Sequence, residues 1–342
     1  MAHIKDFHHT KALMVLLSLV LLMTILFSLS KGYLVIPFKD ICRIILGYPL
    51  DTTPMADTYR AIILDVRLPR ILTCAAIGAA LSLSGVLFQG ILLNPLADPY
   101  TLGVSAGAAF GAGIAILLNL SSTFVSIPSF AFAGACATLF FVIFLSSSDT
   151  RHHRGLSSNN LILSGIIVAA ILSAGLSFLK FIANEQVSVI IFWLMGSFAS
   201  KTMANFWIVF AFLMAGFLIA MYYARDLNLI TLGDKAAASL GVNLAQVTVI
   251  LLLTGSLLAA ISVSISGIIG FVGLLVPHMM RMVTGPDNRV LLPVSLLAGA
   301  IILLCADTIT RTMLPHEIPI GILTALIGGP VFCWIFKRTR SK

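Results

Sequence analysis

Long stretches without a charged residue constrain this chain more than any other feature of its sequence. Residues 99–148 run for fifty residues, and residues 236–280 for forty-five, without Asp, Glu, Lys or Arg. A helix needs roughly 20 apolar residues to cross a bilayer core of about 30 Å, so each stretch is long enough for two spans. Only 10% of the chain is charged, against about 25% in soluble domains. A soluble globular fold and an intrinsically disordered chain are therefore both excluded.

The positions of the charged residues predict an all-α polytopic membrane protein, a single transmembrane domain over residues 1–342. Ten transmembrane helices are expected, at 12–30, 71–93, 100–119, 127–146, 159–180, 203–224, 245–265, 267–283, 290–307 and 318–336. The apolar segment 186–198 is too short to cross and is expected to be a half-helix. The charged segment 225–243 is expected on the cytoplasmic side of the membrane.

The basic residues predict the orientation of these spans. With ten spans and the N-terminus inside, the inside segments hold 12 of the 21 Lys and Arg residues and 6 of the 13 acids, a net charge of +6. The outside segments hold the other 9 basic residues and 7 acids, a net charge of +2. Since Lys and Arg gather in cytoplasmic loops, both termini are expected in the cytoplasm. The basic residues form no continuous tract, so binding to nucleic acid is not expected.

A weak internal similarity suggests a two-halved chain. A shift of 182 residues aligns 80–95 with 262–277, with six identities in sixteen positions. Duplicated halves are common in transporters, but short identities also arise by chance in low-complexity membrane sequence. Both explanations stay open at the level of the sequence.

The residues that power transport or catalysis elsewhere are missing from the expected spans. The chain has no GxxxxGK[ST] nucleotide-binding loop. The span interiors hold no acid or histidine of the kind that ion-coupled carriers use. No nucleophile pair or metal-binding motif supports a membrane enzyme, and no catalytic residue is predicted. The pattern indicates a conduit driven by another protein, with a stand-alone secondary transporter as the alternative.

Short motifs along most of the chain resemble one family. Together, their order and spacing are similar to those of the FecCD-type permeases, the membrane subunits of type II ABC importers for iron–siderophores, haem, cobalamin or molybdate. The motifs are Arg67-Leu-Pro-Arg70, Gly78-Ala-Ala-Leu81, Ser84-Gly85, Gln89, Asn94-Pro-Leu-Ala97, Leu102-Gly-Val-Ser105, Leu232-Gly-Asp234, Leu240-Gly-Val242, Gly267 to Gly273, Val276-Pro-His278, Arg281, Asp307, Arg311 and Glu317-Ile-Pro-Ile-Gly321. Ile318 replaces the leucine usual in the family, a mild apolar change.

The resemblance implies a complete transport assembly. It implies a homodimer in a bacterial inner membrane, with the pathway on its two-fold axis and ten helices per subunit. Two ATPase subunits would use ATP and Mg in the cytoplasm, so this chain would hold no cofactor of its own. A periplasmic or lipoprotein binding protein would deliver the substrate. An iron–siderophore is the first choice of substrate, and haem, cobalamin and molybdate are the alternatives.

The resemblance also implies three sets of site residues. ATPase coupling is expected at Gly233, Asp234, Ala236, Ala237, Leu240 and Gly241, which could otherwise form an ordinary amphipathic loop. Binding-protein docking is expected at Arg67, Arg70 and Arg311. A cytoplasmic gate is expected at Asn94, Leu96, Ser158 and Asn159.

Each of the last two sets has a plainer explanation as well. Arg67 and Arg70 could anchor a helix end at the headgroups, and Arg311 could pair with Asp307 four residues before it on the same helix. In the gate set, Asn-Pro is typical of a turn and Ser-Asn of a helix cap. The histidine pairs at 8–9 and 152–153 are not expected to bind metal, because neighbouring side chains on a helix project in different directions.

Overall fold

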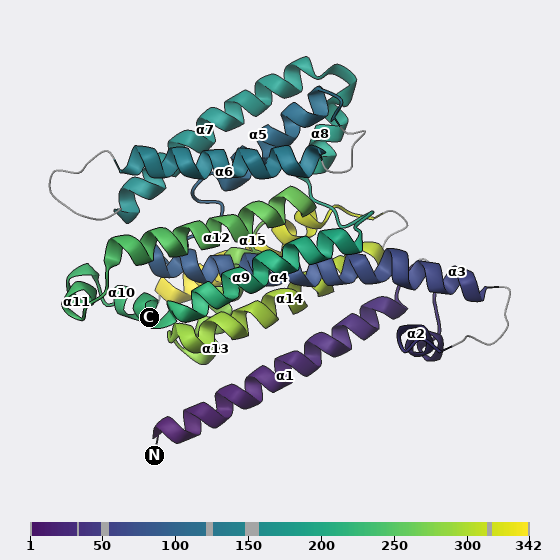
Figure 1. The fold of residues 1–342 in the computed structure, drawn as a ribbon, viewed down its shortest axis with the longest axis horizontal. Coiled ribbons are helices and arrows are strands. Elements are labelled where there is room, and N and C mark those ends of the chain that lie inside the picture. Colours follow the sequence, from purple (N-terminus) through teal and green to yellow (C-terminus); the bar gives the residue numbers. More distant parts are fainter. Residues whose placement is uncertain are drawn as a thin grey trace.

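The structure is a computed structural model that describes residues 2–32, 34–48, 55–120, 126–147, 157–312 and 317–340. Within these residues the secondary structure is helical throughout, which confirms the predicted all-α class. The long helices run along one common direction (Figure 1). Both chain ends lie at one end of this bundle, together with the short helices α10 (Ala224–Ile230) and α11 (Asp234–Ser239). We call this the α11 end, and the opposite end, with α2 (Phe38–Ile45) and α3 (Ala56–Ala61), the α3 end.

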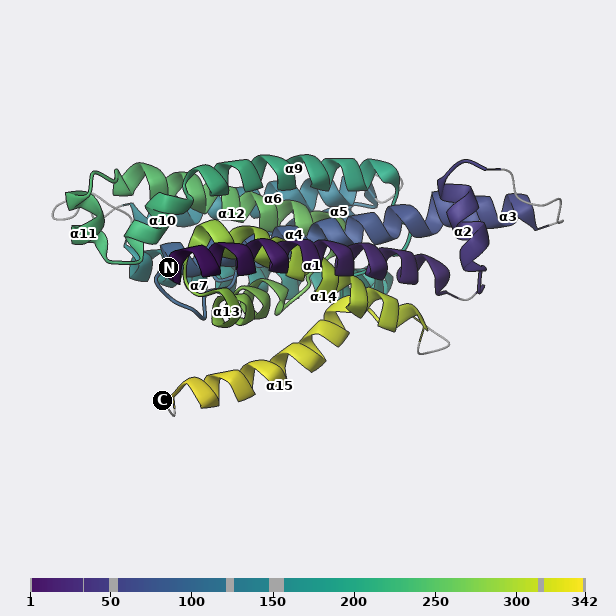
Figure 2. The same cartoon turned by 90° about the horizontal axis from the view of Figure 1, so that it is seen from below.

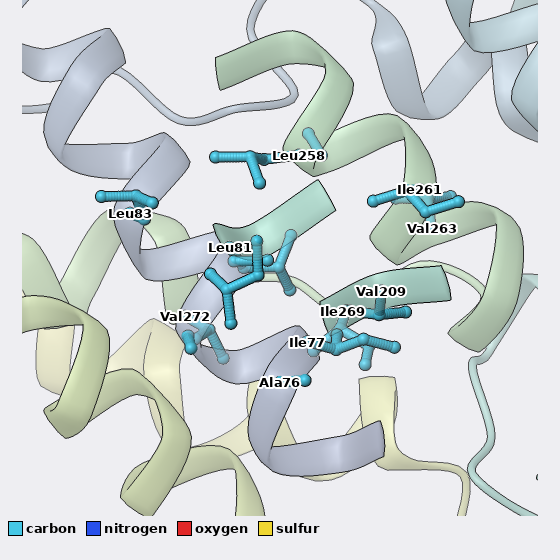
Figure 3. Packing of buried hydrophobic residues seen from close by; sticks show 14 of the residues in the cluster. Ala76, Ile77, Leu81, Leu83, Val209, Leu258, Ile261, Val263, Ile269 and Val272 are labelled. Carbon is cyan, nitrogen blue, oxygen red and sulfur yellow. The ribbon is translucent and has the colours of Figure 1, made fainter. Parts of the chain in front are cut away.

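Helix α4 (Leu68–Ile91) is the centre of the bundle. It continues α3 through a π-helical segment, Ile62–Arg67, and nearly all of its side chains are buried. It packs against α9 (Met203–Tyr222), α12 (Leu244–Ser266), α13 (Val272–Thr284) and α14 (Asn288–Thr312). Figure 3 shows side chains of α4, α9 and α12 meeting in this core. A helix that is apolar on every side can be covered by protein or by lipid, and α4 is covered by protein.

Glycines let these helices approach backbone to backbone. A Cβ atom at Gly85 of α4 would overlap the carbonyl oxygen of Gly273 in α13. A Cβ atom at Gly78 would overlap the carbonyl oxygen of Gly299 in α14. Lipid chains are as apolar as Leu, so close packing of small residues is what holds helices together in a membrane.

A second group of helices covers one side of this core. It contains α5 (Val104–Leu117), α6 (Ser126–Ser146), α7 (Ser158–Ile182) and α8 (Val187–Leu194), drawn at the top of Figure 1. Helix α12 connects the two groups, because it contacts α5 and α6 as well as α4. Helices α1 (Ala2–Ser30) and α15 (Ile320–Arg340) lie at the edge, and α15 diverges from the bundle in Figure 2.

Each of the ten predicted spans contains a helix, but their lengths differ. Among the residues that the structure describes, seven helical stretches are long and apolar enough to cross a membrane. They are Thr10–Ser30, Ala56–Ile91, Ile127–Ser146, Ser158–Ile182, Met203–Tyr222, Leu244–Ser266 and Asn288–Thr312, and the shorter apolar helices are Val104–Leu117 and Ile320–Ile335. The number of crossings therefore stays a prediction, as does the side of the membrane on which the chain ends lie.

The predicted span 267–283 is wrong in its first part. Residues 267–271 leave the helical conformation, with φ at +74° for Gly267 and +68° for Phe271, and α13 begins only at Val272. Neighbouring segments supply hydrogen bonds at this break. The Ser197 N–H donates to the Ser266 carbonyl at 2.8 Å, and the Tyr100 hydroxyl to the Ile269 carbonyl at 3.0 Å.

The same break bears on the internal similarity. Residues 80–91 lie in one continuous helix, whereas the residues aligned with them, 262–273, contain the end of α12, the break and the start of α13. The identical residues thus lie in segments of different conformation. At a shift of 182 residues, the sequence similarity does not correspond to a structural repeat.

Candidate functional site

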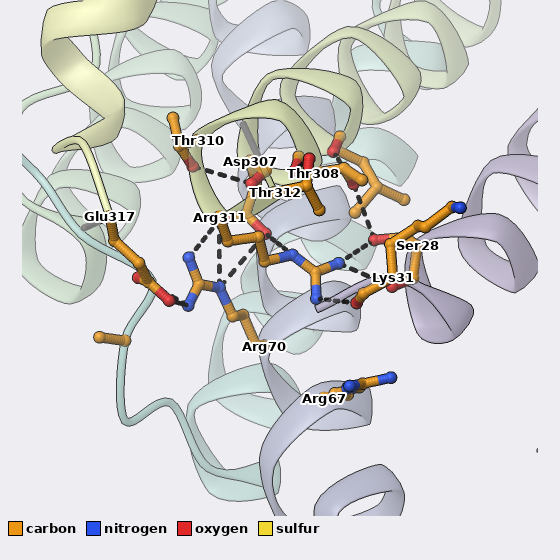
Figure 4. A network of polar contacts seen from close by, with 12 residues as sticks. Ser28, Lys31, Arg67, Arg70, Asp307, Thr308, Thr310, Arg311, Thr312 and Glu317 are labelled. Atoms are coloured by element: carbon orange, nitrogen blue, oxygen red, sulfur yellow. Dashed lines mark hydrogen bonds and ion pairs between the residues drawn. The ribbon is translucent and has the colours of Figure 1, made fainter. Parts of the chain in front are cut away.

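Three arginines at the α3 end, predicted to dock a binding protein, are mostly buried, and two of them, Arg70 and Arg311, share a polar network around Asp307 (Figure 4). Arg70 donates to the carboxylate of Asp307 at 2.9 Å and to that of Glu317 at 2.9 Å. Arg311 lies 3.4 Å from the Asp307 carboxylate, the pairing within one helix expected as the plainer alternative. The side chains of Arg70, Arg311 and Asp307 are 11%, 6% and 1% exposed, whereas Glu317 is 50% exposed.

The same network ties the first helix to the core. Arg311 donates to the backbone carbonyls of Ser28 at 2.8 Å and Lys31 at 3.1 Å. Arg67 is buried at the end of the π-helical segment and donates to the carbonyls of Leu29, at 2.6 Å, and Leu34. Arg67 and Arg70, the arginines with headgroup anchoring as their plainer explanation, thus both bond to groups of the protein itself. Docking stays a prediction, and Glu317 is the most accessible charge through which this network can meet a partner.

The predicted coupling segment forms two short helices at the α11 end. Gly233 and Gly241, with φ at +102° and +89°, end the turns before and after α11. Ala237 is fully buried and fastens α11 to the bundle, so it positions the segment and cannot itself touch a partner. Asp234 lies in the first turn of α11, where a helix N-terminus favours an acid. Leu232 and Leu240 project outward, 67% and 60% exposed.

Side chains that the sequence analysis did not single out hold this segment in place. Asn228 of α10 donates to Asp287 at 2.8 Å and accepts from the backbone and side-chain N–H groups of Asn288, both at 2.8 Å. Arg289 pairs with Asp287 at 2.7 Å. The loop between α13 and α14 therefore fixes α10. Asn228, between the apolar residues Leu227 and Leu229, was the only available signal.

Protonation of Asp287 is expected to loosen this attachment. The hydrogen bonds from Arg289 and then Asn228 lower the pKa of Asp287 to about 2. Because the unfolded-state pKa is about 3.9, the ionised form stabilises the fold above that pH, and the contribution is lost as the pH falls toward 2. Asp287→Asn should lower the free energy of unfolding at pH 7, by at most about 1 kcal/mol for a partly exposed pair. Thermal unfolding in detergent should show the difference shrinking toward pH 2; a difference that does not change with pH would contradict this.

The residues of the predicted gate also lie at the α11 end. Asn94 follows α4 in a turn, and its side-chain oxygen accepts from the Leu96 N–H at 2.9 Å. Leu96 is exposed. Ser158 begins α7 and donates to the Ile91 carbonyl at 3.3 Å, and Asn159 beside it is exposed. The turn at Asn94 is present, and one hydrogen bond joins Ser158 to the end of α4, just before that turn. Gating itself stays a prediction.

No group of three or more His, Cys, Asp or Glu residues that could hold a metal ion occurs among the residues searched, which are those the structure describes. His152 and His153 lie outside that part of the chain, as do the side chains of His8 and His9.

Comparison with known proteins identifies the arrangement. The model of the FecCD transport family matches residues 20–338. The chain belongs to the FecCD transport family. It is a permease subunit of an ABC importer and not an enzyme, and the ATPase activity lies in a separate subunit. Permeases of this family act with an ATPase and a substrate-binding protein.

Relatives of this permease are similar over most of their length. It is 39% identical to the ABC transporter permease protein YvrB of Bacillus subtilis, over 93% of this chain and 91% of that one. It is 39% identical to the hemin transport system permease protein HmuU of Yersinia pestis, over 82% and 84%. A solved structure of a metal-chelate type ABC transporter in an inward-facing conformation matches with a TM-score of 0.84 and 34% identity, over 96% of this chain and 99% of that one. Further relatives are permeases for cobalamin, molybdate and iron chelates.

Proposed function

We propose that two copies of this permease form the translocation pathway for a metal chelate across a bacterial inner membrane. A substrate-binding protein delivers the chelate at the α3 end, and a separate ATPase, which holds the ATP and Mg, drives transport from the α11 end. An iron–siderophore is the first choice of substrate. Haem, cobalamin and molybdate stay as alternatives, because relatives of the family serve each of these substrate classes.

Exposed apolar faces among the described residues support the second copy. Helix α7 exposes Leu163, Ile166 and Phe178 by 59%, 57% and 62%. Helix α15 contacts mainly α13 and α14 and exposes Leu326 by 70% and Trp334 by 60%. Lipid can cover such faces, but α15 diverges from the bundle (Figure 2) and would gain packing from a second subunit.

The observation that carries the proposal is the arrangement of the α11 end. The coupling segment exposes Leu232 and Leu240 on either side of the buried anchor Ala237. The loop that holds Asn94 and Leu96 lies beside it, since Asn94 and Leu232 line one cleft. A partner that moves the coupling segment would therefore act directly on the predicted gate.

The double variant Leu232→Ser/Leu240→Ser should weaken ATPase association by about tenfold or more. Each exposed leucine that a partner buries is worth about 1.5–3 kcal/mol, part of which association costs consume. Co-purification and stimulation of ATPase activity in liposomes measure the effect. Leu46→Ser is the matched control, because Leu46 is 69% exposed at the α3 end. Normal association of the double variant would move the coupling site elsewhere.

A further inference from the structure

Helix α2 (Phe38–Ile45), at the α3 end, lies across the direction of the long helices. Figure 1 looks nearly along α2, whereas α1 and α4 run across the picture. Helix α2 begins shortly after α1 ends at Ser30, and the two helices are in contact. Its 8 residues are far fewer than the roughly 20 that a crossing needs. The proposed transport function gives this helix no role.

One side of α2 is fastened to the bundle. Ile41 and Ile44 are 0% and 7% exposed, and they belong to the main buried cluster together with Ile63 of the π-helical segment. The connection between α1 and α2 is held as well, because Arg67 donates to the backbone carbonyl of Leu34. The fold therefore fixes the position of α2 beside the end of α1.

A second side of α2 is apolar and exposed. Phe38 and Ile45 lie two helical turns apart, so they share one line along the helix. Their side chains are 55% and 46% exposed. Leu46 and Tyr48, which follow the helix, are 69% and 63% exposed. Single exposed apolar residues are common on a protein, but a group of them in one short segment marks a surface that something covers.

Charged residues occupy the third side of α2. Lys39 and Arg43 are four residues apart and lie on one side of the helix, roughly opposite the buried Ile41. Phe38 and Ile45 consequently lie between the buried side and the charged side. A short helix with an apolar strip beside a basic side is typical of helices that lie in a membrane interface.

Lipid reaches this part of the molecule. The candidate span Thr10–Ser30 of α1 is only 11% buried inside the protein, and Phe27, near its end, is 56% exposed. The Nζ atom of Lys31 lies 5.4 Å from the centre of the Phe27 ring. A lysine that follows the last apolar turn of a span reaches the headgroups in this way. Lipid around α1 therefore extends to the end of that helix, where α2 lies.

We propose that α2 is an interfacial anchor, which lies in the lipid–water boundary at the α3 end. Phe38 and Ile45 enter the apolar part of the lipid, and Lys31 and Lys39 contact phosphate groups. A substrate-binding protein that docks and leaves would return the apolar strip to water in each cycle, whereas lipid covers it throughout. Because α2 is fastened to the π-helical segment, the anchor sets the height of the start of α4 in the membrane.

Tryptophan fluorescence of the full-length permease in nanodiscs tests which side of α2 meets lipid. The Phe38→Trp variant should lose most of its added emission in phosphatidylcholine that is brominated on its acyl chains. The matched control, Lys39→Trp on the charged side, should lose little. Bromine near the headgroup should quench more than bromine near the end of the chain, because an interfacial helix is buried only about 5–10 Å deep. The added emission is the increase over that of the three native tryptophans.

Acrylamide, a quencher that dissolves in water, should give the opposite pattern and distinguishes the other occupants. It should quench the Lys39→Trp variant and spare the Phe38→Trp variant. If acrylamide quenches Phe38→Trp and the brominated lipid does not, this side of α2 lies in water and the proposal is overturned. If neither quenches it, protein covers this side, which overturns the proposal in favour of a second copy of the chain.

Removing the apolar side chains avoids the preference of tryptophan itself for the membrane interface. The double variant Phe38→Ser/Ile45→Ser should lower the unfolding midpoint in nanodiscs. Lys39→Ser, which also places a serine in α2 but on the charged side, should lower it less. An unchanged midpoint in the double variant would show that lipid contact does not stabilise α2, and the assignment would fail.

Discussion

Asp307→Ala is expected to destabilise this permease by about 3–5 kcal/mol, the cost of leaving buried charges without their partner. Asp307 has a side chain that is 1% exposed and accepts from Arg70 at 2.9 Å. Arg311, 6% exposed, lies 3.4 Å from the same carboxylate. Removing the acid would leave two buried guanidinium groups close together, with only the exposed Glu317 to balance them.

Unfolding of purified protein in detergent, by heat or denaturant, measures this loss. The matched control is Asp287→Ala, which breaks an ion pair with side chains 52% and 35% exposed and should cost about 1 kcal/mol or less. Similar effects of the two substitutions would mean that the network around Asp307 is open to water.

The same network changes how docking can be tested. Charge reversal at Arg67 or Arg311 would break hydrogen bonds to the backbone of Leu29 or Ser28. Weaker association with a binding protein would then reflect loss of the fold as well as loss of contact. Glu317→Gln alters the exposed edge of the network and leaves the buried arginines in place, so it is the cleaner probe.

Gly85→Ala is expected to destabilise the permease by about 1–3 kcal/mol, although alanine favours a helix over glycine by about 1 kcal/mol. The new Cβ would overlap the backbone carbonyl of Gly273, which cannot move aside as a flexible side chain could. Helices α4 and α13 would have to separate along their contact. The expected result is a lower unfolding midpoint and a lower yield of monodisperse protein.

The matched control for this contact is Gly270→Ala. A Cβ at Gly270 meets no atom within 4 Å, and the backbone there does not have a positive φ. The control should therefore keep the unfolding midpoint of the unmodified protein. If Gly85→Ala is equally harmless, the two helices are not in backbone contact.

The fold class and the positions of the helices could be predicted from the amino-acid sequence. A low content of charge leaves too little polar surface for water, and charge-free runs of about 20 residues must be helical in lipid to satisfy their backbone groups. Helices consequently appear at all ten predicted positions. The motifs from Arg67 onward were sufficient to place the chain in its family. These properties depend on local composition and on order along the chain, both of which are visible in the sequence.

The contacts of the motif residues could not be predicted from the sequence, because they depend on the tertiary structure. The bonds of Arg70 and Arg311 join α4, α14 and the end of α1, positions up to 283 residues apart. Charge at these positions suggested an exposed surface, but three helices close around it. The break before α13 likewise receives hydrogen bonds from Ser197 and Tyr100, residues far from it in the chain. Burial and pairing of a side chain depend on which segments lie together in space. In a membrane protein, close packing determines which helices associate, because lipid covers any apolar helix face equally well.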